Sequence, residues 1–531
     1  MNSELGDAEA AMNWLRIKGR EDPNFFCRYS KDGEGRLATL FWRVNASYLD
    51  YKAFSDVLII DSTYKTNIYE MPLVLFVGIN NHRGSVIFGC GLLCNEKEHT
   101  FSWLIERFMS SMDNVAPITV VVDDDERLHK ALHTHMPSAR QMLCSWHIGR
   151  NVGQNVKNLK VQKVLGKLIY ASYSIEEWDL IWDNLIAEHG LADNEWFKSL
   201  HGRRERWAEA FFRAHHCAEV CSTQRCEGMN NKIMTKVGQF TKLVEFVPRL
   251  YHSFGRLRDR YLLDDFKSRN HLRQFELTMK GIEEQVFNIF TDDIYLVIRG
   301  QMVFENQFIV SSRIDYEDSR NLTLYVTQYG VEDRCWLVTY VGRPEDEDGD
   351  NYTCSCQLFE SDGIPCCHIF CVFKWEGVQN YPKSLICQRW KKDAGKKACI
   401  DKVVMDNEFG ESQACRYAKL IGIAKRACYN MSLTNEGFET GVGELNSLVG
   451  KHYAATRVKK ARLNPDDNEN VVMDPVVSRT KGTHGHKAAE GNVNRNEGVG
   501  EGPRCGECHN HGHNRRTCPD IVKGDASKGR G

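Results

Sequence analysis

The sequence lacks a strong net charge and has no long hydrophobic run. Its 531 residues include 69 lysines and arginines against 71 aspartates and glutamates, which gives a formal net charge of -2. Because this balance carries no overall signature of nucleic-acid binding, any contact with DNA must come from local basic patches. No apolar run is long enough to span a membrane, and the chain does not open with a signal peptide. We therefore expect an intracellular protein without a membrane partner.

Cysteine, in contrast, is abundant, with 20 residues. In a small secreted chain this content would suggest disulfides, but a long intracellular chain is expected to keep its thiols reduced or to use them at metal sites. The length allows roughly two to four domains. A hydrophobic content of 42% is enough for a large core.

The stretch from Asp56 to His147 has the pattern of one α/β unit. Short β-branched runs predict strands ending in Asp61 and in the three aspartates 123–125, and apolar residues at helical spacing predict two helices. The expected order is strand, strand, strand, helix, strand, helix, strand, which is that of a ribonuclease-H-like fold. Its first and fourth strands are neighbours, so Asp61 would lie beside one of the later aspartates, with Mg²⁺ between the carboxylates. The simpler alternative is that Asp61 is a solvated turn residue.

Four motifs resemble the transposase domain of Mutator-like elements, and especially the plant transposase-derived family of far-red impaired response regulators and their related sequences. The resemblance covers roughly residues 10 to 375. The motifs are Asp61-Ser-Thr-Tyr-Lys-Thr-Asn67, Phe76-Val-Gly-Ile-Asn-Asn-His82, Cys144-Ser-Trp-His147 and Ser222-Thr-Gln-Arg-Cys-Glu-Gly-Met-Asn230.

The resemblance implies an acidic triad at Asp61, Asp124 and Glu227, with Asp123 as the alternative second member. A helical insertion over residues 149–218 would separate the second and third members. In an active transposase, such a triad holds two Mg²⁺ or Mn²⁺ ions that activate water or a 3′-hydroxyl for attack on a DNA phosphate. By position alone, Glu227 is better explained as a residue on the surface of a helix, and it is the surrounding motif that favours the triad position.

Residues 354–368 contain the spacing C-x-C-x9-C-x-H. Three thiolates and one imidazole fill the four positions of tetrahedral zinc, which is the arrangement of a structural site. The candidate ligands are Cys354, Cys356, Cys366 and His368. The pattern resembles a SWIM zinc finger, in which a hairpin supplies the first pair of ligands and the start of a helix supplies the second. The alternative is a set of four unrelated core residues.

Two further motifs combine cysteine and histidine. Cys144 and His147 provide two ligands where zinc takes four, so we expect a packed strand end rather than a closed metal site. Near the end of the chain, the spacing C-x2-C-x4-H-x4-C is that of a zinc knuckle, in which metal replaces a hydrophobic core. Its ligands would be Cys505, Cys508, His513 and Cys518. Knuckles often bind single-stranded nucleic acid through stacking, but aromatic residues are missing here, so nucleic acid and protein remain alternative ligands.

These features predict an α/β chain with a ribonuclease-H-like transposase domain, a small ββα SWIM zinc finger and a C-terminal CCHC zinc knuckle. The predicted segments are a lead-in (1–55), the transposase domain with its insertion (56–260), a helical connector (261–319), the SWIM finger (320–380), a helical region (381–450), a basic patch and flexible linker (451–503), the knuckle (504–520) and a disordered tail (521–531). Arg457-Val-Lys-Lys-Ala-Arg462 is either a nuclear-import patch or an ordinary basic face. Related regulators carry an N-terminal zinc-binding domain that contacts DNA, and we expect this chain to begin after it.

Three functions fit these expectations. We favour a nuclear, transposase-derived regulator of transcription that binds zinc at two structural sites. It would use the old catalytic fold as a scaffold for DNA or transcription-regulator proteins, form homo- or hetero-dimers with family members, and lack recombinase activity and a small-molecule substrate. The second is an active DDE-type transposase that uses two divalent metal ions. The third is an adaptor whose zinc modules bind protein or RNA.

Overall fold

The computed structural model divides the chain into two compact units, residues 1–480 and 481–531. It describes residues 6–22, 24–171, 173–220, 222–223, 225, 228, 237–271, 273–316, 321–331, 334–342, 351–395, 427–428, 431–432, 434–457 and 472–477. Glu227, the four predicted knuckle ligands Cys505, Cys508, His513 and Cys518, and residues 458–462 of the basic patch lie outside this description. Among the described residues, no helix is both long and apolar enough to cross a membrane.

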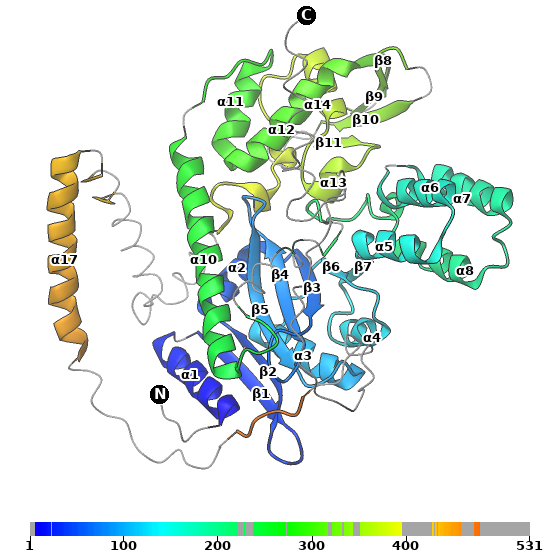
Figure 1. The fold of residues 1–531 in the computed structure, drawn as a ribbon. Coiled ribbons are helices and arrows are strands. Elements are labelled where there is room, and N and C mark those ends of the chain that lie inside the picture. Colours follow the sequence, from blue (N-terminus) through cyan, green and yellow to red (C-terminus); the bar gives the residue numbers. More distant parts are fainter. Residues whose placement is uncertain are drawn as a thin grey trace, which may run out of the picture. The chain divides into compact units, whose positions relative to one another are not determined.

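A seven-stranded sheet, in the order β1-β2-β5-β4-β3-β6-β7, forms the centre of the first unit (Figure 1). Its strands are β1 (Phe26–Lys31), β2 (Leu37–Arg43), β3 (Val57–Thr63), β4 (Leu73–Ile79), β5 (Ser85–Leu93), β6 (Thr119–Val122) and β7 (Arg140–Leu143). The pairs β3–β6 and β6–β7 are parallel, and the other neighbours are antiparallel. The strands and helices predicted between residues 56 and 147 therefore occur in the expected order, and the first and fourth of those strands are neighbours.

Both faces of the sheet are buried under hydrophobic cores. Successive residues of each strand point to opposite faces and so belong to different cores. Leu58 and Ile60 of β3 join a core with α3 (Glu98–Ser111) and α4 (Glu126–His135), where Phe76 stacks on Phe108 with ring centroids 4.2 Å apart. Val57 and Ile59 face a second core, which α10 (Leu243–Asn270) also enters. The helices α1 (Asp7–Glu21) and α2 (Asn45–Phe54) complete this part of the chain.

A helical insertion with its own core follows β7. It contains α5 (Ser145–Asn155), α6 (Leu159–Tyr170), α7 (Ile175–His189), α8 (Glu195–Gly202), η1 (Arg204–Arg206) and η2 (Glu209–Phe211). Trp178, Trp182 and Trp207 are buried together at its centre. Ser174 and Glu177 form a capping box at the start of α7, and Gly190 ends that helix in the left-handed conformation.

The last large part is a helical pair followed by a four-stranded sheet in the order β11-β10-β9-β8. Its elements are α11 (Lys280–Ile289), α12 (Asp292–Phe304), η3 (Glu305–Gln307), β8 (Phe308–Asp315), β9 (Asn321–Gln328), β10 (Cys335–Val341), β11 (Asn351–Cys354), α13 (Leu358–Asp362), α14 (Cys367–Glu376), η4 (Lys383–Leu385) and η5 (Gln388–Trp390). The helix α17 (Asn435–Arg457) lies later in the chain. Strands β9 and β10 pair antiparallel. Strand β8 lies within residues 261–319, which the sequence assigned to a helical connector, so the sheet begins earlier than expected.

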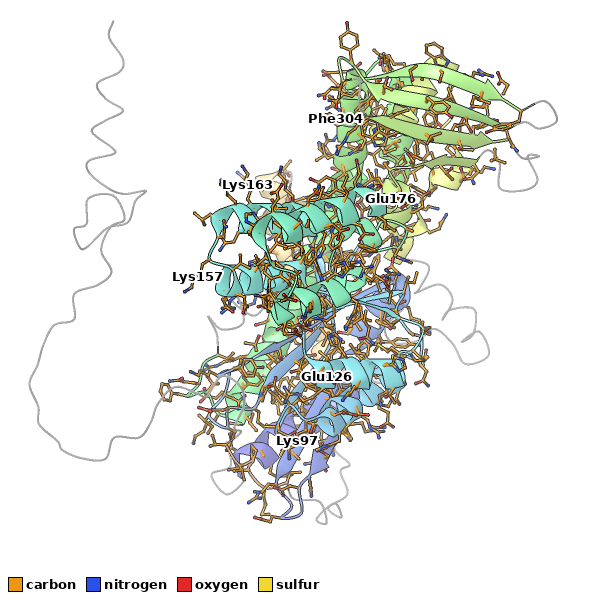
Figure 2. The ribbon with its side chains drawn as sticks, turned by 90° about the vertical axis from the view of Figure 1, so that its right-hand side faces the viewer. Lys97, Glu126, Lys157, Lys163, Glu176 and Phe304 are labelled. Atoms are coloured by element: carbon orange, nitrogen blue, oxygen red, sulfur yellow. The ribbon has the colours of Figure 1, made fainter. Side chains whose placement is uncertain are left out.

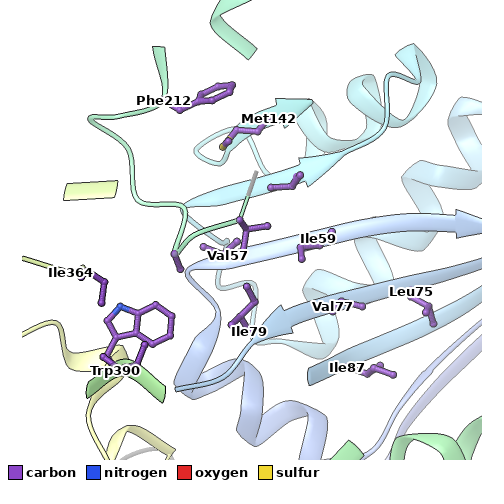
Figure 3. Packing of buried hydrophobic residues seen from close by; sticks show 14 of the residues in the cluster. Val57, Ile59, Leu75, Val77, Ile79, Ile87, Met142, Phe212, Ile364 and Trp390 are labelled. Atoms are coloured by element: carbon purple, nitrogen blue, oxygen red, sulfur yellow. The ribbon is translucent and has the colours of Figure 1, made fainter. Parts of the chain in front are cut away.

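The small sheet and the large sheet are joined by shared packing. Ile364 and Trp390 belong to the same buried cluster as Val57 and Ile79 at the end of the large sheet (Figure 3). Beneath this cluster the buried guanidinium of Arg389 contacts Asp56 Oδ2 at 3.1 Å and donates to the carbonyl of Ile79 at 2.6 Å. The region around the predicted SWIM finger is therefore built onto the large sheet rather than tethered to it.

Candidate metal centre and acidic sheet edge

Four cysteine and histidine side chains converge where β11 meets α14. Cys354 ends β11 and Cys356 follows in the turn, whereas Cys366 caps α14 and His368 lies in the first turn of that helix. One ligand atom from each residue lies within 4.8 Å of the others, and Cys354, Cys366 and His368 are buried. A hairpin thus supplies one pair and the start of a helix supplies the other, which is the arrangement that the resemblance to a SWIM zinc finger implies.

The chemistry of this cluster fits a thiophilic divalent ion. His368 Nδ1 lies 3.6 Å from Cys354 Sγ, and the backbone N–H of Cys356 donates to the same sulfur at 3.5 Å. A hydrogen bond from Cys354 lowers the pKa of Cys356, whereas its bond with Cys356 raises the pKa of Cys354 and burial raises that of Cys366, so a single thiolate is shared among the three sulfurs. Trp336 stacks on the His368 ring with centroids 4.3 Å apart and fixes its orientation. Thiolates and an oriented imidazole are the ligands of structural zinc.

Two neighbouring cysteines stay outside the cluster. Burial raises the pKa of Cys367 to about 12 and that of Cys371 to about 11. Cys367 uses its backbone N–H to donate to Gln301 Oε1 at 3.0 Å, which ties α14 to α12. Both thiols are therefore neutral core groups rather than competing ligands.

The second site is the edge of the large sheet where β3 and β6 end side by side. Ile59 of β3 pairs with Val121 of β6 in parallel, so Asp61 and Asp123 each stand two residues further along neighbouring strands. Asp61 is 8% exposed. Carboxyl ends of adjacent parallel strands meet at one edge of a sheet. The backbone therefore brings Asp61 and Asp123 to the same place.

A histidine of α5 lies at this edge. His147 Nδ1 is 3.3 Å from Asp123 Oδ1. Burial lowers the pKa of His147, but a hydrogen bond to Cys144 and the charges of Asp123, Cys144 and Asp61 outweigh it and raise the pKa to about 9. The imidazole is therefore protonated at neutral pH and supplies a positive charge beside Asp123.

The other two aspartates face different partners. Asp124 forms an ion pair with Arg203 at the end of α8, and His129 Nε2 lies 3.9 Å from its Oδ1. Asp125 caps α4 by accepting from the backbone N–H of Arg127 at 2.9 Å. The side chain of Asp124, which we predicted as the second triad member, is thus held by the insertion. Asp123 is the residue beside His147. The triad role of either aspartate stays a prediction, as does that of Glu227, which lies outside the described residues.

The Cys-x-x-His motif forms a packed strand end. Cys144 caps α5, and its sulfur accepts from the N–H of His147 at 3.4 Å and from both the N–H and the hydroxyl of Thr223 at 3.2 Å. Burial raises the pKa of this thiol, but the bonds from His147 and Thr223 outweigh it and lower the pKa. Within the described part of the chain, Cys144 belongs to no group of metal-binding side chains like that at Cys354. Thr223 links the Ser222 motif to this edge.

Comparison with known proteins identifies two domains. Residues 57–151 match the MULE transposase domain, and residues 335–373 match the SWIM zinc finger. Among curated relatives from Arabidopsis thaliana, Protein FAR1-RELATED SEQUENCE 7 is 27% identical over 386 residues, which cover 72% of this chain and 49% of the relative. Protein FAR-RED IMPAIRED RESPONSE 1 is 26% identical over 496 residues, covering 90% of this chain and 58% of the relative.

The chain spans about half the length of the curated relatives it matches. It carries both domains predicted from its motifs, and FAR1 and the FAR1-related sequence proteins are its homologues. These matches confirm the family resemblance drawn from the motifs. They also agree with the structure, because the MULE match contains the acidic edge and the SWIM match contains the cysteine and histidine cluster.

Proposed function

We propose that this chain is a nuclear, transposase-derived regulator of transcription. Its acidic sheet edge is part of a domain that binds partners and does not catalyse recombination. One observation carries the proposal. The two carboxylates that follow β6 contact cations of the chain itself, since His147 contacts Asp123 and Arg203 pairs with Asp124. A recombinase needs such carboxylates for two divalent ions. The homology to FAR1-related proteins supports the same conclusion.

The scaffold is proposed to have a ribonuclease-H-like fold. The order β5-β4-β3-β6-β7, with three antiparallel strands followed by two parallel ones, supports this assignment. The insertion after β7 then interrupts the domain before its last acidic segment. In this fold the edge beside Asp61 is the place where a nucleic-acid phosphate would bind.

The SWIM finger is proposed to bind one structural Zn²⁺ through Cys354, Cys356, Cys366 and His368. The donor set fills all four positions of a tetrahedral ion and leaves none for a substrate, so the ion would stabilise the fold. A second structural zinc at residues 505–518 is proposed from their spacing alone. DNA or transcription-regulator proteins are the proposed partners, with nuclear entry through the basic residues 457–462.

The proposal is tested by asking which residues regulation needs. In plant cells, the full chain fused to a fluorescent protein should enter the nucleus and change the transcription of target genes. The double variant Asp61→Asn and Asp123→Asn should keep both properties, whereas Cys366→Ser should lose the transcriptional effect. If the aspartate variant loses regulation while remaining folded and nuclear, the scaffold interpretation is wrong.

A working transposase is the second candidate, and the placement of Asp61 and Asp123 on neighbouring parallel strands favours it. In that case Asp123, rather than Asp124, would be the second carboxylate. Purified chain incubated with Mn²⁺ or Mg²⁺ and candidate transposon ends should then cleave or join DNA. We expect no such products, and cleavage that disappears in Asp61→Asn would establish the transposase instead.

A further inference from the structure

The charges of the helical insertion are segregated. Between Arg127 and Ile175 the sequence contains no aspartate or glutamate. The exposed cations along α5, α6 and the turn between them are Arg150, Lys157, Lys160, Lys163 and Lys167. The next helix, α7, reverses the pattern and carries acids without any lysine or arginine, at Glu176, Glu177, Asp179, Asp183 and Glu188. In Figure 2, Lys157 and Lys163 lie toward one side of the insertion and Glu176 toward the other.

These cations have no carboxylate partners among the described residues, although α6 packs beside the acidic α7. Some exposed lysines elsewhere pair with an acid on the same helix: Lys130 pairs with Glu126 at 3.2 Å and Lys198 pairs with Glu195 at 2.9 Å, each within one helical turn. Helix α6 offers its lysines no such acid. Unpaired positive charges gathered on one element instead leave a region of positive potential open to an anionic partner.

The lysines of α6 form a row on its outer face. Lys160, Lys163 and Lys167 recur at helical spacing, and Val161, Leu165, Leu168 and Ile169 point the opposite way into the insertion core. The row is about 10 Å long from Lys160 to Lys167. Because the buried stripe anchors the helix, the row is presented on a rigid support.

The row leads away from the acidic edge. The hydroxyl of Tyr170 donates to the carbonyl of Ser145 at 3.2 Å, so the end of α6 lies against the start of α5, where His147 contacts Asp123. Lys167 stands one turn before Tyr170. Arg150, one turn after His147, lies 5.7 Å from the ring centroid of Trp146, which steadies its guanidinium. Positive charge therefore begins close to the edge and continues outward along α6.

We infer that Arg150 and the α6 lysines form a binding surface for the phosphate backbone of duplex DNA. The inference rests on the proposed function and gives its scaffold a specific contact surface. Flexible point charges spaced along a helix suit sequence-independent contact with phosphates, which positions a duplex without reading its bases. DNA is favoured over an acidic protein because the row starts at the edge of a transposase domain and follows one direction, as a phosphate backbone does.

The test compares two triple variants of the full chain in binding to a short fluorescent duplex of random sequence. Lys160→Gln, Lys163→Gln and Lys167→Gln remove the row, while Lys97→Gln, Lys130→Gln and Lys198→Gln make the same change in charge at exposed lysines elsewhere. Glutamine keeps the helix propensity of lysine. Unchanged thermal transitions in both variants will show that folding is intact.

Loss of the row should weaken binding at low salt by about tenfold or more, and should reduce the slope of log affinity against log salt by up to about 2.7, since each phosphate contact contributes about 0.9. The control variant should stay within about twofold of the wild type. Equal affinities and slopes in all three proteins would overturn the surface but leave the proposed function standing through other contacts. Binding to single-stranded or double-stranded RNA without binding to duplex DNA would also overturn it. If the wild type binds no nucleic acid, the inference fails and the proposed regulator would act through protein partners alone.

Discussion

The metal centre and the acidic edge both gather groups that can carry negative charge, yet they balance that charge differently. At Cys354 to His368, thiol and imidazole atoms face one another within 4.8 Å, an arrangement that a divalent ion completes. At the sheet edge, carboxylates meet cations built into the chain, at His147 and Arg203. The comparison indicates that one site depends on metal and that the other can persist without it.

The largest expected effect comes from removing the metal centre. Cys366→Ser should remove about one equivalent of zinc from the full chain and destabilise the chain by on the order of 5 kcal/mol or more. The loss should reach the large sheet, because Ile364 shares a core with Val57. Metal analysis combined with thermal unfolding measures both effects. Cys335→Ser, at an exposed cysteine of the same finger, is the matched control and should change neither. Full zinc content in Cys366→Ser would contradict the assignment.

A smaller effect should follow from breaking the buried pair that ties the two regions together. Burial raises the pKa of Asp56, but Arg389 and His216 outweigh it and lower the pKa, so the carboxylate is charged. Arg389→Met would leave that charge without its main partner and should cost about 3–5 kcal/mol. Asp56→Asn in the same chain should recover part of the loss. Chemical denaturation of the two single variants and the double variant gives the coupling energy. A value near zero would mean that the pair does not join the sheets.

The third prediction concerns pH at the acidic edge. The pKa of His147 is raised from 6.5 to about 9 on folding. Its contribution to stability is therefore fully present below pH 6.5 and is lost as pH rises through about 9, with a size on the order of 1–3 kcal/mol. His147→Gln should flatten this part of the stability profile. His133→Gln, at an exposed histidine of α4, should not. Identical profiles for the wild type and His147→Gln would show that the imidazole does not balance the edge.

The smallest effect should be confined to the insertion. Ser174→Ala removes the side chain that accepts from the N–H of Glu177 at 3.1 Å, and should cost about 1 kcal/mol. Ser199→Ala, at an exposed position within α8, is the control. Hydrogen exchange should increase in the first turn of α7 while the metal centre and the sheet edge remain unchanged. Increased exchange at either site would show that the insertion is coupled to them.

Much of the fold and the position of the metal centre could be predicted from the sequence, because the relevant signals are local. Alternating and helical periodicity gave the strand and helix order between residues 56 and 147, and ligand spacing located the finger. The choice between Asp123 and Asp124 could not be made in this way, since it depends on Arg203, 79 residues further along the chain. The contact of Arg389 with Asp56 is likewise long-range. Tertiary ion pairs leave no periodic trace in a sequence.

The most direct test of the central claim is a titration of the zinc-loaded full chain with Mn²⁺. Binding is measured as the loss of the spectroscopic signal of free Mn²⁺. Because His147 already balances the edge, the wild type and Asp61→Asn should show the same weak, nonspecific binding. Asp123→Asn should behave in the same way. Specific binding of one or two Mn²⁺ ions by the wild type that is lost in Asp61→Asn would contradict the account and return the acidic edge to the role of a metal-dependent active site.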